Sequence, residues 1–122
     1  MLKDSLYKIT SLSRQEGSIE AALKINADNA IFKGHFPNQP VLPGACMLHM
    51  LKEVLETALD ASLRMKKADT IKFLTLIDPL QQGVLQLTVA YKPADNNELF
   101  VTANLSAGTN SCFKFKGVFV GI

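Results

Sequence analysis

The chain has 122 residues, of which 48% are apolar and 20% are charged, and its formal net charge is +2. This length and apolar content fit one compact domain with its own hydrophobic core. The small net charge argues against nucleic acid as a partner, because nucleic-acid-binding domains usually carry a concentrated basic face.

Cysteine usage and hydropathy bear on where the protein works. Cys46 and Cys112 form neither a metal-ligand nor a redox pattern, as is usual for a reducing compartment. No segment approaches the roughly 18 apolar residues of a membrane span, and residues 1–4 do not begin a secretory signal. We therefore expect a soluble cytoplasmic protein. Two histidines and two unpatterned cysteines make no recognisable metal site, so neither a metal nor a cofactor is predicted.

Alternating apolar and polar residues predict two strands in the first part of the chain. Residues 6–12 are a weak strand candidate, and a turn follows at residues 15–17. From residue 18 the alternation is regular, with Ile19, Ala21, Leu23 and Ile25 on one side. This pattern is typical of a half-buried strand. A turn at residues 26–29 then leads into a segment rich in glycine and proline.

One long helix is predicted over residues 47–63, ending near residues 61–62 or shortly after. Its apolar residues recur at helical spacing, and a polar stripe runs opposite them: His49, Lys52, Glu53, Glu56 and Asp60. Because a helix buried on all sides would not need such a stripe, part of it should face water, a subunit interface or a substrate cleft. Arg64, Lys66 and Lys67 follow as a solvated helix end or as a docking patch.

Period-two patterns return after the helix and predict four strands, at residues 68–77, 85–92, 99–106 and 113–119. Short turns join the last three into an antiparallel meander. The predicted fold class is therefore α+β, with one long helix on a curved antiparallel sheet of about six strands. So short a chain cannot cover both edges of the sheet, and we expect it to associate.

The segment before the helix carries the clearest chemical signal. Gly34, Pro37, Pro40, Pro43 and Gly44 make residues 32–44 rigid and rich in turns, and His35 lies among them. The helix that follows would begin with unpaired N–H groups and a partial positive charge, which can stabilise an oxyanion. A base beside an oxyanion site can remove a proton α to a carbonyl group.

Residues 34–44, GHFPNQPVLPG, resemble the G-H-F-P-x-x-P-x-x-P-G signature of the hotdog-fold 3-hydroxyacyl-[acyl carrier protein] dehydratases, the FabZ and FabA families. The resemblance implies a hotdog fold, a homodimer or higher homo-oligomer with its active site across the interface, and an acyl carrier protein or coenzyme A thioester as substrate. An acidic carrier protein would then be a natural partner for the basic residues after the helix.

The same resemblance assigns roles to individual residues. His35 is the expected general base for the C2 proton of the substrate. Independently of the resemblance, Phe36 is expected to line the pocket, because Pro37 fixes it beside His35. The N–H groups at Gly44 and Ala45 would face the thioester carbonyl. FabZ-like members place a carboxylate on the helix five residues after the glycine, and here that position holds His49.

Three interpretations of His49 remain open. It is the proton donor of a variant dehydratase, or it only holds the leaving hydroxyl while Glu53 or another group supplies the acid. Alternatively the acid is lost, and the protein is a non-catalytic acyl-binding subunit. A hotdog acyl thioesterase is a further possibility, although no carboxylate lies in the signature. The departure at His49 favours specialised lipid or polyene synthesis over bulk fatty-acid synthesis.

Three further side chains near the signature have competing interpretations. Cys46, close to the helix start, is either a nucleophile or a small buried side chain, and burial is the preferred interpretation. Met47 and Met50 could border an acyl channel, although methionine on a helix more often fills the core.

Overall fold

The computed structural model describes residues 1–33 and 40–122. Within them the chain forms six strands, one α-helix and a short 3₁₀ helix. In chain order these are β1 (Tyr7–Gln15), β2 (Ser18–Ile25), η1 (Ala30–Phe32), α1 (Gly44–Leu59), β3 (Leu63–Phe73), β4 (Val84–Ala94), β5 (Glu98–Ala107) and β6 (Asn110–Gly121).

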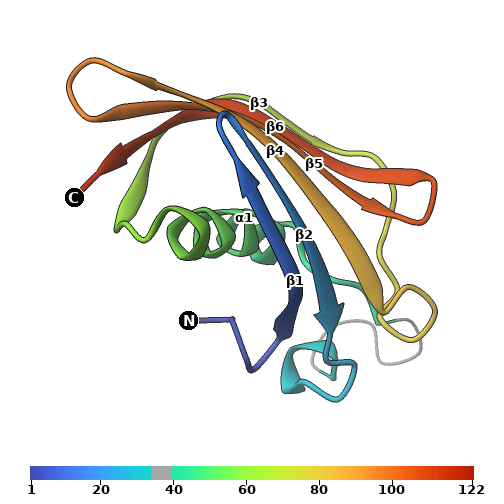
Figure 1. Ribbon diagram of the computed structural model, residues 1–122. Coiled ribbons are helices and arrows are strands. Elements are labelled where there is room, and N and C mark those ends of the chain that lie inside the picture. Colours follow the sequence, from blue (N-terminus) through green and yellow to red (C-terminus); the bar gives the residue numbers. More distant parts are fainter. Residues whose placement is uncertain (34–39) are drawn as a thin grey trace.

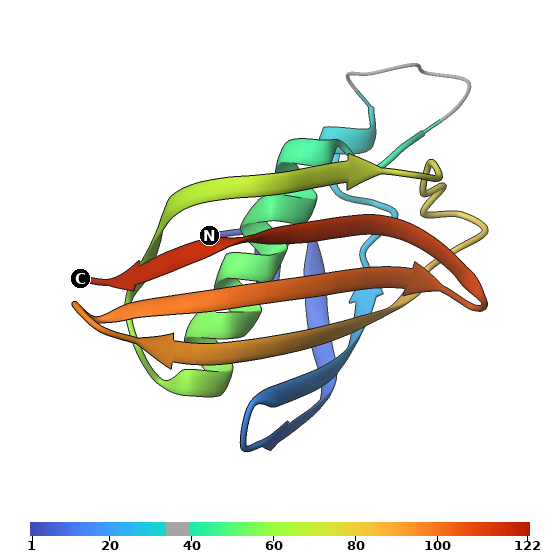
Figure 2. The ribbon, with the colours of Figure 1, turned by 90° about the horizontal axis from the view of Figure 1, so that it is seen from above.

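The six strands form one antiparallel sheet in the order β1-β2-β4-β5-β6-β3. The sheet curves around α1, which lies along its concave side (Figures 1 and 2). This is the hotdog arrangement that the sequence predicted. The edge strands are β1 and β3, and β3 reaches its edge position by pairing with the C-terminal strand β6 rather than with β4.

The core lies between the helix and the concave side of the sheet. The alternation predicted for β2 is confirmed, because Ile19, Ala21 and Leu23 are fully buried and Ile25 nearly so. The helix contributes its own buried residues: Cys46, Met47, Met50, Leu51, Val54 and Leu55. Met47 and Met50 are therefore core residues, as the preferred interpretation of both had it.

The predicted end of the helix is wrong by a few residues. Helix α1 stops at Leu59, because Asp60 takes the left-handed conformation (φ 50°). The Asp60 N–H still makes the last helical hydrogen bond, to the Glu56 carbonyl. Leu63, expected in the helix, instead begins β3 and pairs with Gly121. Its N–H donates to the Glu56 carboxylate at 2.9 Å, so a side chain of the helix fixes the start of the strand.

Strand β3 is correspondingly displaced from its prediction of residues 68–77, since it spans Leu63–Phe73. Arg64, Lys66 and Lys67 therefore belong to an edge strand, not to a helix end. The other strands agree with prediction to within a few residues. In the part of the chain that the structure describes, no helix is long and apolar enough to cross a membrane.

Candidate active site

The first turn of α1 leaves backbone donors open. Pro43 occupies the N-cap position, where its side chain makes no capping hydrogen bond, and the first turn holds no acidic residue. The N–H groups of Cys46 and Met47 both donate to the Pro43 carbonyl, at 3.0 and 3.4 Å. Within residues 1–33 and 40–122, the N–H groups of Gly44 and Ala45 have no acceptor. At the positive end of the helix dipole, these two amides can bind a carbonyl oxygen that gains negative charge.

A close contact fixes the residue type at Gly44. A methyl group added there would lie 2.7 Å from Cζ of Phe73, the last residue of β3. The Phe73 ring also stacks on Phe113 of β6, with 5.4 Å between the ring centroids. Gly44 is thus required for the close approach of the aromatic ring, and the contact brings the end of the edge strand to the start of the helix.

An apolar cavity of about 310 Å³ opens beside this helix start. The residues that line it come from α1, β3 and β6: Ala45, Leu48, His49, Lys52, Met65 and Phe119. Met65 and Phe119 are direct cross-strand partners, so the cavity lies between the helix and the β3 edge of the sheet. Its two polar side chains, His49 and Lys52, are one turn apart on the helix. Such a cavity suits an acyl chain whose polar end meets a histidine.

The exposed His49 lies one helical turn after Ala45, so both line the same cavity. The structure thereby brings together Gly44, Ala45 and His49 among the predicted site residues. His35 and Phe36 lie outside the residues that the structure describes. Their placement beside the helix start remains a prediction from the signature.

Glu53 occupies a different environment from the one its place in the polar stripe predicted. It is only 5% exposed. Its carboxylate accepts hydrogen bonds from the backbone N–H groups of Leu2 and Lys3, at 2.9 and 3.1 Å, and from the Tyr7 hydroxyl at 3.0 Å. Burial and the nearby Glu53 charge raise the pKa of Tyr7. The carboxylate is occupied in holding the N-terminal segment and does not line the cavity.

Cys46 is 7% exposed, and burial raises the pKa of its thiol. Both facts oppose a thiolate nucleophile and agree with the interpretation of a small buried side chain. Among residues 1–33 and 40–122, no group of three or more His, Cys, Asp or Glu side chains could hold a metal ion.

Sequence reasoning missed four residues around this site: Lys52, Met65, Phe73 and Phe119. Lys52 carried a usable signal, because it lies three residues after His49 on the predicted polar stripe. Met65 and Phe119 are separated by more than fifty residues, and only the register of β3 with β6 places them together. The contact of Phe73 with Gly44 could likewise be predicted only by knowing that β3 ends at Phe73.

Comparison with known proteins finds the same fold in solved structures and identifies the family of this chain. A chain of the dehydratase heterocomplex ApeI:P from Xenorhabdus doucetiae matches with a TM-score of 0.72 at 19% identity, over 92% of this chain and 96% of that one. An uncharacterised protein from Erwinia carotovora gives 0.64 at 24% identity, over 92% and 91%. A thioesterase from Haemophilus influenzae gives 0.66 at 13% identity, over 97% and 80%.

At these identities the solved structures establish the hotdog fold alone. The family comes from a separate match, in which the model of the ApeI-like family, described as ApeI dehydratase, covers residues 11–114. That range includes the signature, the helix, all of β2, β3, β4 and β5, and parts of β1 and β6. It agrees with the dehydratase resemblance noted in the sequence. The chain belongs to the ApeI-like dehydratase family.

Proposed function

We propose that this chain is a FabZ/FabA-like dehydratase that converts 3-hydroxyacyl thioesters into trans-2-enoyl thioesters and water. One observation carries the proposal: among the described residues the N–H groups of Gly44 and Ala45 have no acceptor, and Ala45 and His49 line the same apolar cavity. Membership of the ApeI-like dehydratase family supports the same reaction class.

The proposed reaction begins with His35 taking the C2 proton of the substrate. The electron pair of that bond becomes the C2=C3 double bond, and the C3–O bond breaks. The amides at Gly44 and Ala45 stabilise negative charge that develops on the thioester oxygen, because they are donors already oriented in the protein. The departing hydroxyl takes up a proton and leaves as water, so substrate equals product plus water.

His49 is our candidate for the proton donor. Histidine side chains commonly act as general acids and bases near neutral pH. His49 occupies the helix position where the FabZ-like signature has a carboxylate, and it lines the cavity with Lys52. Since the Glu53 carboxylate is held by the N-terminal segment, it is a poor alternative acid.

A homo-oligomer through the β3 edge is part of this proposal. β3 is an edge strand, and its apolar side chains Ile71 and Phe73 are 39% and 52% exposed. Pairing of two β3 strands would extend the hydrogen-bonded sheet and cover these side chains. In hotdog dehydratases of the resembled type such pairing completes the active site, with one catalytic residue from each subunit. We expect the same for His35 and His49.

We propose an acyl carrier protein or coenzyme A thioester as the substrate, in specialised lipid or polyene synthesis. The assay is hydration of a trans-2-enoyl thioester, followed by loss of its conjugated absorbance, for the wild type and for His35→Ala. We expect hydration by the wild type and at least about a hundredfold loss in the variant, as for removal of a general base. A wild-type protein inactive on both carrier-bound and coenzyme A substrates would contradict the proposal.

A non-catalytic acyl-binding subunit is the second candidate. The replacement of the usual carboxylate by His49 favours it, as does the neighbour described as a dehydratase heterocomplex. It predicts acyl binding without turnover, and activity that returns only with a second hotdog chain. The thioesterase alternative has weaker support, because the described lining of the cavity contains no carboxylate. Release of free thiol from an acyl thioester would revive it.

A further inference from the structure

The side of the sheet that faces away from α1 carries a concentration of lysines. Cross-strand pairing sets three rows over β4, β5, β6 and β3. They are Lys92, Phe100, Val118 and Lys67; then Ala90, Thr102, Lys116 and Thr70; then Thr88, Asn104, Lys114 and Lys72. We call these residues the outer lysine face. No single segment of the chain contains it, because the sheet register assembles it from four strands.

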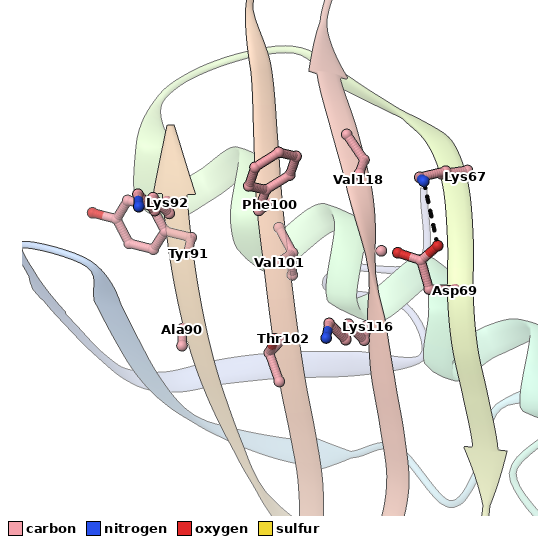
Figure 3. Close-up of a pocket in the computed structure, with 11 residues that line it drawn as sticks. Lys67, Asp69, Ala90, Tyr91, Lys92, Phe100, Val101, Thr102, Lys116 and Val118 are labelled. Atoms are coloured by element: carbon pink, nitrogen blue, oxygen red, sulfur yellow. Dashed lines mark ion pairs between the residues drawn. The ribbon is translucent and has the colours of Figure 1, made fainter. Parts of the chain in front are cut away.

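Two shallow hollows lie on the outer lysine face. One, of about 410 Å³, has Ala90, Phe100 and Val118 among its lining residues, with lysines around them (Figure 3). The other, of about 450 Å³, has Lys72 and Lys114 in its lining. Phe100 is 48% exposed although it lies on a central strand. A partly exposed apolar centre with a charged rim is the usual anatomy of a protein–protein interface.

The charges of this face are mostly uncompensated. Lys67 forms an ion pair with Asp69 at 3.4 Å (Figure 3). Among the residues that the structure describes, no ion pair involves Lys72, Lys92, Lys114 or Lys116. The face is therefore locally positive although the whole chain carries only +2. A second copy of the chain is a poor occupant, because like charges would face each other.

We propose that the outer lysine face docks an acidic protein, and that this partner is the carrier protein that brings the thioester, so the inference rests on the proposed function. Rows of carboxylates on the carrier would pair with the unpaired lysines, and an apolar side chain would enter the hollow at Phe100. Such charge complementarity mainly accelerates association and is weakened by salt. The absence of arginine from this face gives it none of the bidentate groups that favour phosphate recognition.

The position of this face relative to the candidate active site suits a carrier with a flexible prosthetic arm. Lys72 directly precedes Phe73, whose ring lies against Gly44. Lys114 is the cross-strand partner of Lys72. The end of the face at these two lysines is therefore the end of the sheet where α1 begins, as Figure 2 shows for β3. An arm from a docked carrier needs only to pass around this end of the sheet.

The test compares two double variants with the same change of charge. Lys114→Glu/Lys116→Glu reverses charge on the face. Lys8→Glu/Lys24→Glu is the control, because both lysines are exposed strand residues that pair with each other at the β1 side of the sheet.

Each variant is assayed on a carrier-bound enoyl thioester and on the N-acetylcysteamine thioester of the same acyl group. We expect kcat/KM on the carrier-bound substrate to fall about tenfold or more for the face variant only. Both variants should retain wild-type rates on the small thioester.

The outcomes separate the docking surface from the reaction itself. Equal losses in the two variants on carrier-bound substrate would overturn the docking surface and leave the dehydratase intact. If the wild type hydrates neither substrate, the proposed function fails, and titration with apo carrier protein then decides the docking. Binding lost only in the face variant would support it. Absence of carrier binding by the wild type would overturn the proposed docking surface. Binding of anionic vesicles or single-stranded nucleic acid to the face would not rescue the proposal.

Discussion

The two ends of helix α1 differ in how many of their polar groups form hydrogen bonds with the rest of the protein. At the C-terminal end several polar groups have hydrogen-bond partners. The Asp60 N–H donates to the Glu56 carbonyl, and the Arg14 guanidinium donates to the Ala58 carbonyl at 3.2 Å. The Glu56 carboxylate receives the N–H of Leu63. This end of the helix is fixed by tertiary contacts.

The N-terminal end has no comparable support among the described residues. Pro43 provides no side-chain cap, and no acceptor for the amides of Gly44 and Ala45 lies in the part of the chain that the structure describes. A missing cap costs a helix about 1 kcal/mol of stability. We interpret the contrast as a functional division of the helix. Its C-terminal half stabilises the fold, and its first turn is available to bind a ligand. The following variants test that division.

The largest effect is expected at His49, beside the open end. His49→Ala should lower kcat/KM for enoyl-thioester hydration by about a hundredfold or more, if the imidazole is the proton donor. Because the side chain is exposed, the urea midpoint should not change. His49→Glu, which installs the carboxylate of the FabZ-like pattern, should recover part of the rate. Full activity in His49→Ala would remove the residue from the mechanism.

A change of stability rather than of catalysis is expected at Glu53. Glu53→Ala leaves the N–H groups of Leu2 and Lys3 and the Tyr7 hydroxyl without their acceptor. We expect the free energy of unfolding in urea to fall by about 2–4 kcal/mol. Tyr7→Phe removes a single one of these bonds and should cost about 1 kcal/mol. Activity per folded molecule should stay unchanged in both, and a selective loss of kcat in Glu53→Ala would contradict the division.

A smaller effect should appear at Gly44. The new methyl group in Gly44→Ala would meet the Phe73 ring, which must then move. The gain in helix propensity, which is about 1 kcal/mol in a helix interior and smaller at its first residue, opposes this strain. Stability should therefore remain close to wild type. Since the shifted ring lies beside the open amides, we expect about a tenfold loss of kcat/KM, equivalent to about 1.4 kcal/mol. Gly83→Ala is the control, because its nearest neighbour, the Pro79 carbonyl oxygen, would be 3.6 Å away.

The smallest change is expected at Asp60, at the closed end. Asp60 has a φ of 50°, a conformation that glycine adopts without steric cost. Asp60→Gly should therefore raise the free energy of unfolding by about 0.5–1 kcal/mol. Asp60→Ala, which keeps a β-carbon in the same backbone conformation, should give no gain. Equal stability changes in the two variants would show that φ is not the cause.

Much of the fold was predictable because its determinants are local. Period-two alternation depends only on neighbouring residues, so β2, β4 and β5 were found within a few residues of their bounds. The turn formers between them indicated the meander. The signature segment and the helix start were likewise local, and they indicated Gly44, Ala45 and His49 together. Whether His35 meets them depends on residues outside the described part of the chain.

Contacts distant in sequence decided the remainder. Leu63 fits the helical spacing, yet its pairing with Gly121 places it in a strand. Glu53 is polar and fits an exposed stripe, yet the N-terminal segment folds over it and supplies three donors. Neither partner can be read from the residues next to Leu63 or Glu53.

The sequence by itself therefore determined most of the strands, the presence of the helix and the hotdog class, since these follow from residue type and short-range spacing. The chemistry at the helix start stays a prediction. Tertiary structure alone decided where the helix ends, which carboxylate is occupied and which strand is left at the edge. It also assembled the apolar cavity and the outer lysine face, whose residues belong to strands far apart in the chain. The physical reason is that strand register and burial depend on pairing partners, which local patterns do not specify.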